Sequence, residues 1–423
     1  MKTIQHNVDG FGNAFAPNLT YARGSVLAST EDDFRKLRHA WRIVRERGVG
    51  NVYNFTGLDH GLPLEPAEIA LSDDEIAPAI YYDRLETAAL EHLGGRTPEH
   101  DFAVFNRLTG ATLATVLTLV SPGDIVIGVS ATHSHPSVMR AASLAGATFI
   151  DVSGANEFES VLAEKSRVPL VVLTRLAVTY DLLGQEEIER IIGAAHARGA
   201  LVYVDDAGGA RVGPAIFDQP KMLEFGVDIG ATGLDKYGTI GPRFGLMAGR
   251  ADLVSRIRVR GFEMGLEARP MFYPAVVRSL ENYTRERVQT LVDTTKKVAA
   301  ELRAIFGNRL HETPVTAQLF ADDILTIALE RGPDRVRESR LVPYEAKAAL
   351  CMLLLQDYGI MTVHFVGVPP GGADLLIKFV RPESLERFGG AAKFARAIDA
   401  SLDKLATIIA DPAKIRALLF GGT

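Results

Sequence analysis

Two nearby segments decide the fold: LVYVDDAGGARVGP, residues 201–214, and DIGATGLDKYGTIGPRFGLMAG, residues 228–249. The first places Asp205 and Asp206 at the end of an apolar run, and the second places Lys236 among glycines and small residues. Burying a charged side chain is costly unless a partner compensates it. The two segments therefore predict a chemical site at the end of a buried strand.

Short apolar runs alternate with amphipathic runs on both sides of these segments. The pattern predicts strands at 125–129, 148–152, 170–176 and 201–206, and helices at 109–121, 135–147 and 185–199. Apolar strands between amphipathic helices indicate a mostly parallel sheet that is covered on both faces. The predicted fold class is therefore α/β. We expect residues 244–249 to form a further strand that runs back after the lysine.

The flanking regions predict an N-terminal arm with a helix and a smaller C-terminal α/β domain. Residues 31–48 carry an apolar stripe at helical spacing that includes Phe34, Leu37, Trp41 and Val44, with Trp41 expected in the core. After a long helix at 282–307, we expect strands at 322–330, 361–365 and 373–380 and helices at 345–359 and 391–409. The expected division is 1–65 for the arm and helix, 66–275 for the large domain and 276–423 for the small domain.

Composition bounds the possible partners and location. The 423 residues carry a net charge of −6, which gives no overall basic field for nucleic acid. The single cysteine, Cys351, lies in an apolar helical run, so we expect packing and no internal disulfide. The N-terminus has no apolar signal core, and no run is long enough to span a bilayer. We expect a cytoplasmic protein.

Several polar residues follow predicted strands, where ligands bind in parallel α/β sheets. A lysine in a partly dry pocket has a lowered pKa and forms an imine with an aldehyde. A carboxylate such as Asp205 can keep a pyridine nitrogen protonated. The helix start at residues 108–112 offers N–H groups to a phosphate, and an imidazole can stack on a ring face. Together these features describe pyridoxal 5'-phosphate.

The chain resembles the fold-type I pyridoxal-phosphate-dependent enzymes over most of its length. VYVDDAG and GLDKYGTIGPRFG match the family pattern of a strand, Asp, any residue and Ala, followed at family spacing by a Lys. The DK…GP…G turn is most similar to the branch that contains bacterial selenocysteine synthase and D-glucosaminate-6-phosphate ammonia-lyase. The resemblance implies the fold-type I transferase fold, with a mostly parallel central sheet.

The resemblance also implies individual roles. Lys236 matches the imine lysine, Asp205 the partner of the ring nitrogen, and Ala207 the residue under the ring. His135 matches the stacking residue, with His133 as the second choice. The other cofactor-binding residues that it implies are Thr109, Gly110, Ala111, Thr179, Thr232 and Arg243.

The chain also departs from the branch pattern. Gly233 stands where a serine or threonine usually precedes the lysine, and Thr232 is one residue further away. Arg243 stands where glutamine is frequent, and we expect it either to bind phosphate across a dimer interface or to pair with a surface acid. The proposed substrate contacts are Asn54, His60, Lys378 and Arg381.

Metal binding is the alternative use of these residues. Asp205 and Asp206 could hold Mg²⁺, but no GxxxxGK[ST] phosphate loop accompanies them. His133 and His135 have no third ligand at a suitable spacing. We therefore expect no metal.

The implied function is that of a lyase on an amino-acid-like small molecule. The branch implies an external aldimine and a carbanion, followed by α,β-elimination or β-replacement. Aldol cleavage, decarboxylation and racemisation would use the same residues. Two further alternatives are a tRNA-linked transferase like selenocysteine synthase and a non-catalytic homologue. The resemblance also implies a homodimer or higher homo-oligomer.

Overall fold

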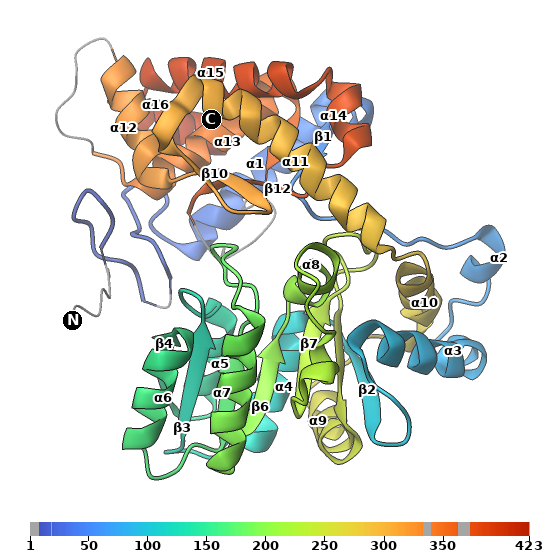
Figure 1. Cartoon of the computed structure of the whole chain (residues 1–423). Helices are drawn as coiled ribbons and strands as arrows, with labels where there is room; N and C mark the ends of the chain where they lie inside the picture. The colour runs from blue at the N-terminus through green and yellow to red at the C-terminus, as the bar shows by residue number, and fades with distance from the viewer. Residues whose placement is uncertain (1–7, 18, 333–339, 363–372, 423) are drawn as a thin grey trace. The chain divides into compact units, whose positions relative to one another are not determined.

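The computed structural model describes residues 8–17, 19–332, 340–362 and 373–422 of the chain (Figure 1). The chain forms two units: unit 1 comprises residues 1–58 and 290–423, and unit 2 comprises residues 59–289. The division into segments at residues 65 and 275 stays a prediction. Among the described residues, no helix has both the length and the apolar character needed to cross a membrane.

Unit 2 is built around a seven-stranded sheet. Its strands are β2 (His100–Phe105), β3 (Ile125–Ser130), β4 (Thr148–Ser153), β5 (Leu170–Leu173), β6 (Leu201–Asp205), β7 (Ile229–Gly233) and β8 (Gly245–Arg250). The spatial order is β2-β8-β7-β6-β5-β3-β4. The pairs from β7 to β4 are parallel, whereas β8 is antiparallel to both β7 and β2. This confirms the α/β class and the strand that runs back after the lysine.

Helices cover both faces of this sheet (Figure 1). Along β6, Val202 and Val204 face one apolar core, and Tyr203 faces the other. Because side chains alternate along a strand, a central strand buried on both sides is apolar at every position. The helices of unit 2 are α2 (Pro66–Ile69), α3 (Ile76–Leu93), α4 (Leu108–Leu119), α5 (Pro136–Leu144), α6 (Gly154–Glu164), α7 (Gln185–Ala197), α8 (Gly209–Ile216), α9 (Ala251–Glu263) and α10 (Tyr273–Glu281).

Unit 1 has its own apolar core and two small sheets. Its strands are β1 (Tyr53–Phe55), β9 (Leu310–Glu312), β10 (Thr316–Leu319), β11 (Ile360–Thr362) and β12 (Leu375–Lys378). One sheet has the antiparallel order β12-β10-β9, and the other pairs β1 with β11 in parallel. Its helices are α1 (Thr30–Arg47), α12 (Ala321–Arg331), α13 (Pro343–Tyr358), α14 (Pro382–Phe388), α15 (Ala391–Ala406), α16 (Pro412–Phe420) and most of α11 (Arg285–Phe306).

Most elements predicted for the C-terminal region are confirmed, with one exception. The helices at 345–359 and 391–409 correspond to α13 and α15, and the strand at 373–380 contains β12. The strand predicted at 361–365 is present as β11 up to Thr362, and the rest lies outside the described residues. The strand predicted at 322–330 is wrong, because this segment is helix α12. Its buried residues Ala321, Ile324, Leu325 and Ala328 have helical spacing, and the first turn is acidic, as helix starts prefer.

The helix predicted at 31–48 is confirmed as α1, but the prediction that Trp41 lies in the core is wrong. Trp41 is 57% exposed, because the buried face of α1 is formed by Asp33, Lys36, Leu37, Ala40 and Ile43. Lys36 Nζ donates to Asp33 Oδ1 at 3.0 Å, so an ion pair occupies part of the buried face of α1. A prediction from apolar residues alone places no charged residue on that face. Cys351 is buried in α13, as expected for a packing residue.

Candidate active site

Lys236 lies in the loop between β7 and β8, at the carboxyl end of β7. Thr239 fixes this loop, because its backbone N–H and its hydroxyl both donate to the Lys236 carbonyl, at 3.3 and 2.8 Å. The lysine side chain is half-buried. Burial lowers the pKa of Lys236, against the opposing charges of Asp235 and Asp205. The amine is therefore neutral, and able to act as a nucleophile, at a lower pH than an ordinary lysine.

Asp205 is the last residue of the neighbouring strand β6 and is buried. Within the described part of the chain, its Oδ1 atom has no hydrogen-bond partner. Burial raises the pKa of Asp205 to about 6, although the nearby charge of Lys236 favours the ionised form. A buried carboxylate oxygen without a partner is costly, so this atom fits an N–H donor supplied by a ligand.

Asp206, by contrast, is fully engaged within the protein. Its two carboxylate oxygens accept hydrogen bonds from Arg175, one from Nε at 3.1 Å and one from Nη2. Both side chains are almost completely buried. This bidentate pair neutralises the charge of Asp206 and gives it a structural role. No group of three or more His, Cys, Asp or Glu side chains suited to a metal occurs within the described ranges.

His135 caps α5 and has a fixed ring orientation. The backbone N–H of Ser137 donates to His135 Nδ1 at 3.1 Å, and the Ser137 hydroxyl lies 2.7 Å from the same atom. Nδ1 is therefore an acceptor, and Nε2 carries the proton of the neutral ring. Burial, with the nearby charge of Lys236, lowers the pKa of His135 to about 3. A neutral ring held in one orientation near Lys236 suits stacking on an aromatic cofactor.

His133 lies in the same loop and differs from His135. Burial lowers the pKa of His133, and the charge of Asp151 opposes this effect. Asp151 is also bound by Ser134, whose backbone N–H and hydroxyl donate to it at 2.9 and 2.7 Å. The charge of Lys236 contributes to the lowered pKa of His135, and the choice of His135 over His133 as the stacking residue stays a prediction.

An ion-pair cluster lies beside the lysine. His60 Nε2 lies 3.0 Å from Asp235 Oδ2, and Arg243 Nε lies 3.6 Å from the same oxygen. Burial of Asp235 opposes ionisation, but the hydrogen bond of His60 and the charges of Lys236 and Arg243 lower its pKa to about 2. Asp59 N–H donates to Asp235 O at 3.0 Å, which fixes the segment that carries His60. The structure thus brings His60 and Arg243 to the lysine loop.

The start of α4 forms the positively charged end of the site. Burial lowers the pKa of Arg107, the residue that precedes α4, and the nearby charge of Arg243 lowers it further. The amides of Gly110 and Ala111 donate to Arg107 O, at 2.9 and 3.2 Å, so they already belong to the helix ladder. Thr109 precedes them and is exposed. Two guanidinium groups near a helix N-terminus form an environment that favours an anion such as phosphate.

Thr179 and its neighbour Tyr180 belong to the loop after β5. Thr179 Oγ1 lies 2.9 Å from Thr132 Oγ1, so the two hydroxyls form a hydrogen bond. The hydroxyl of Tyr180 lies 2.5 Å from that of Tyr237, the residue after Lys236. These bonds connect the loop after β5 to the lysine loop and to the loop after β3.

Arg211 is a residue of the site that the sequence did not reveal. It is buried in α8, and its Nη2 atom donates to Thr232 Oγ1 at 2.9 Å, Gly233 O at 2.7 Å and Ala207 O at 3.1 Å. It therefore connects the end of β7, which leads to Lys236, to the segment that follows Asp205. The Thr232 hydroxyl is occupied by this contact. In the sequence, RVGP gives no sign that its arginine is buried. The apolar and small residues around Arg211 are the one sequence signal that could have indicated a buried position.

Three proposed substrate residues, Asn54, Lys378 and Arg381, belong to unit 1, and their roles stay predictions. Asn54 stabilises a local turn: its Oδ1 accepts from Thr56 N at 2.9 Å and its Nδ2 donates to Leu58 O at 3.0 Å. Lys378 is buried in β12, and Arg381 precedes α14.

The sheet and the lysine–carboxylate arrangement define a class of protein. The fold is that of the fold-type I pyridoxal-phosphate-dependent proteins. Serine palmitoyltransferase from Sphingomonas wittichii matches with a TM-score of 0.59 at 18% identity, over 82% of this chain and 87% of that chain. Aspartate aminotransferase from Thermotoga maritima matches with a TM-score of 0.57 at 16% identity, over 88% of this chain and 97% of that chain.

The chain belongs to the UPF0425 family of pyridoxal phosphate-dependent proteins. It is 32% identical over 404 residues to the member from Methanothermobacter thermautotrophicus, which covers 94% of this chain and 100% of the relative. The member from Methanosphaera stadtmanae is 28% identical over 359 residues, or 84% of this chain and 89% of the relative. No family model matches the chain. Pyridoxal phosphate is the cofactor, and the unpartnered oxygen of Asp205 and the neighbouring Lys236 fit it.

Proposed function

We propose that this protein catalyses α,β-elimination or β-replacement on an amino-acid-like small molecule. The observation that carries the proposal is the pairing of a half-buried lysine with a buried carboxylate that has an unpartnered oxygen, at the ends of two adjacent parallel strands. Asp205 Oδ1 has no hydrogen-bond partner among the described residues, in contrast to Asp206, both of whose oxygens bind Arg175.

Each residue has a distinct task in this proposal. Pyridoxal phosphate, when bound, withdraws electrons from the α-carbon of an amino-acid substrate. Asp205 would hold a proton at the ring nitrogen, and Lys236 Nζ would bind the cofactor aldehyde covalently. Once substrate displaces it, the Lys236 amine, whose pKa burial lowers, would accept the proton of the α-carbon.

The remaining groups would bind and orient. The ring of His135, fixed by Ser137, would stack on the cofactor and exclude water from one face. Arg107, which precedes α4, and Arg243, in the loop that carries the lysine, would bind the phosphate by charge. Asp235 balances the charge of Arg243 and, through His60, fixes the loop that carries the lysine. Thr179 would approach the ring hydroxyl from the loop after β5.

The choice of a lyase is supported by the sequence of the lysine turn. DK…GP…G, residues 235–245, resembles the turn of the selenocysteine synthase and D-glucosaminate-6-phosphate ammonia-lyase branch. The acidic net charge of −6 favours a small molecule over tRNA as the substrate. By the same resemblance, we propose that the active form is at least a homodimer.

The test is incubation of the cofactor-loaded protein with a panel of amino acids and β-substituted amino acids. We expect a change in the visible spectrum of the cofactor for at least one of them, together with a reaction product. Elimination would release the β-substituent, ammonia and a keto acid. Replacement, with an added thiol as the second substrate, would release the β-substituent and form a new amino acid. Lys236→Ala should lose both signals, whereas Lys297→Ala, a change at an exposed lysine on α11, should retain them.

The products decide between reaction types. Release of carbon dioxide or an aldehyde, or inversion of the substrate without ammonia, would replace the lyase by a decarboxylase, an aldolase or a racemase. A spectrum that no member of the panel changes would contradict an amino-acid-like substrate.

A further inference from the structure

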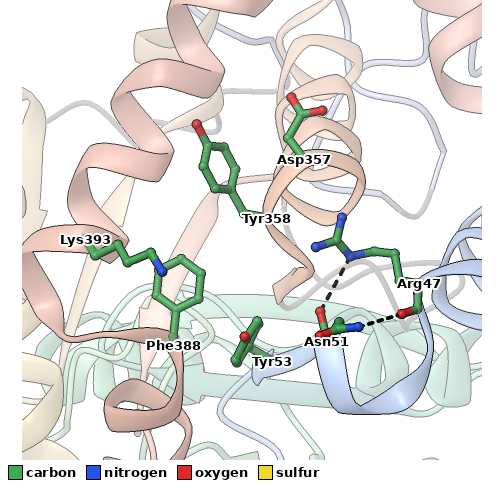
Figure 2. Close-up of a pocket in the computed structure, with 7 residues that line it drawn as sticks. All are labelled: Arg47, Asn51, Tyr53, Asp357, Tyr358, Phe388 and Lys393. Atoms are coloured by element: carbon green, nitrogen blue, oxygen red, sulfur yellow. Dashed lines mark hydrogen bonds between the residues drawn. The ribbon is translucent and has the colours of Figure 1, made fainter.

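Unit 1 contains a pocket that none of the proposed catalytic residues lines. Its volume is about 430 Å³, within the range of small-molecule sites. Its walls come from the end of α1 and the short turn after it, from β1, from the end of α13, from the end of α14 and from the start of α15 (Figure 2). All of these segments belong to unit 1.

One side of the pocket is aromatic. Tyr53, Tyr358 and Phe388 line it, and the rings of Tyr53 and Phe388 meet edge to face with centroids 5.1 Å apart. The guanidinium of Arg387 lies 4.7 Å from the centre of the Tyr53 ring and fixes it from outside the pocket lining. Aromatic rings held in this way offer preformed surfaces for a flat ligand, at little entropic cost on binding.

Two cations, Arg47 and Lys393, line the pocket at opposite edges (Figure 2). Arg47 is held by its Nη1 atom, which donates to Gln356 O at 2.7 Å. Lys393 lies with Nζ 5.0 Å from the centre of the Phe388 ring, so its charge is placed next to the aromatic wall. The acidic group of the lining, Asp357, is neutralised by Lys404, which donates to its two oxygens at 2.9 and 2.8 Å. Two cations are therefore left without an equal negative charge in the lining.

Gly359 allows a close approach of two segments at the edge of the pocket formed by Arg47 and Asn51. Its φ is +71°, and a Cβ there would lie 2.1 Å from Asn51 O and 3.1 Å from Arg47 Nε. The absence of a side chain lets the turn around Asn51 approach β11, and Tyr53 N–H donates to Gly359 O at 2.8 Å. Figure 2 shows Asn51 and Arg47 joined by hydrogen bonds at this edge. Contacts with the backbone thus fix the position of Arg47 and of the strand that carries Tyr53.

We propose that this pocket binds a small aromatic molecule that carries one anionic group, a phosphate or a carboxylate. The ring packs against Tyr53 and Tyr358, which are partly exposed and lie beside the buried Phe388. The anion pairs with Lys393, the cation beside the aromatic wall, because an ammonium group is a usual protein donor to phosphate and carboxylate. The site goes beyond the proposed reaction and does not depend on it.

The experiment is calorimetric titration of the cofactor-loaded protein, dialysed free of excess cofactor because the cofactor is itself an aromatic anion. The probes are AMP and 4-hydroxyphenylacetate as aromatic anions, adenosine as a neutral ring, and inorganic phosphate as an anion without a ring. We expect at least one aromatic anion to bind with a Kd of about 1 mM or lower, at least about ten-fold tighter than adenosine and phosphate. Which of the two binds distinguishes a phosphate from a carboxylate ligand.

Two variants and a control connect binding to the pocket. Lys393→Glu reverses one cationic charge at an exposed position, and Tyr358→Leu removes one ring; each should weaken binding by about ten-fold. Lys414→Glu, an equal change of charge at an exposed lysine outside the lining, should leave the Kd unchanged. Failure of both aromatic anions to bind, equal binding of inorganic phosphate, or an unchanged Kd in both pocket variants would overturn the proposal.

Discussion

The unpartnered carboxylate of Asp205 gives a prediction with a distinctive sign. In the cofactor-free protein, Asp205→Asn should increase the free energy of unfolding at a pH of about 8. Burial raises the pKa of Asp205 from 3.8 to about 6, and a difference of this size corresponds to about 3 kcal/mol. This figure is the cost of keeping the group ionised in the folded state. An amide of the same size removes the charge and therefore most of that cost.

The sign follows from proton binding. Between pH 3.8 and about 6 the folded protein retains a proton on Asp205 that the unfolded chain has lost. The contribution of this group to stability is therefore largest at low pH and falls as the pH rises through this interval. The difference between variant and wild type should be small near pH 4 and reach its full value above about pH 7.

The assay is urea unfolding of both proteins without cofactor, followed by far-UV circular dichroism at several pH values. The matched control is Asp206→Asn, which leaves Arg175 buried without its carboxylate partner and should cost about 3–5 kcal/mol at the same pH. Neighbouring aspartates should thus give opposite effects. A destabilised Asp205→Asn protein at a pH of about 8, without recovery at low pH, would refute this reasoning.

Three further predictions concern single contacts. Arg211→Met should lower the free energy of unfolding by about 2–4 kcal/mol in a urea titration, because it leaves buried acceptors at the ends of β6 and β7 unsatisfied; an unchanged midpoint would contradict this. His135→Ala should weaken cofactor binding by about three- to ten-fold in equilibrium dialysis, since stacking contributes about 0.5–1.5 kcal/mol. His135→Phe keeps an aromatic ring and should retain most of the affinity, so equal losses in the two variants would argue against stacking. In the same urea titration, Gly359→Ala should lower the free energy of unfolding by at least about 2 kcal/mol, and Gly307→Ala, where a Cβ meets nothing within 4 Å, should lower it less. An equal loss in the two variants would show that the close contact of Gly359 with Asn51 O does not affect stability.

The central sheet, and the positions of Asp205 and Lys236 at its edge, could be predicted from the sequence because they depend on local sequence patterns. A strand buried on both faces, such as β6, is apolar at every position, and the first polar residue marks its end. Asp205 and Lys236 stand at the ends of adjacent strands, so topology alone brings them together.

The rest depends on contacts between distant segments. Arg211, Arg175 and Lys36 are charged residues in buried positions, and only the three-dimensional pairing shows which partners compensate them. The same pairing turns Trp41 outward, because the buried face of α1 contains an ion pair instead of an apolar stripe. For segment 322–330, the β-branched residues favoured a strand, and the capping charges and burial in the core of unit 1 made it a helix.

The central claim, that Lys236 holds the cofactor, is tested most directly by reduction of the cofactor-loaded protein with borohydride and identification of the modified peptide by mass spectrometry. The account predicts a stable pyridoxyl group on the peptide that contains Lys236, and none on the corresponding peptide of Lys236→Arg. Modification of a different lysine in the wild-type protein, or no modification after reduction of a visibly coloured sample, would contradict it.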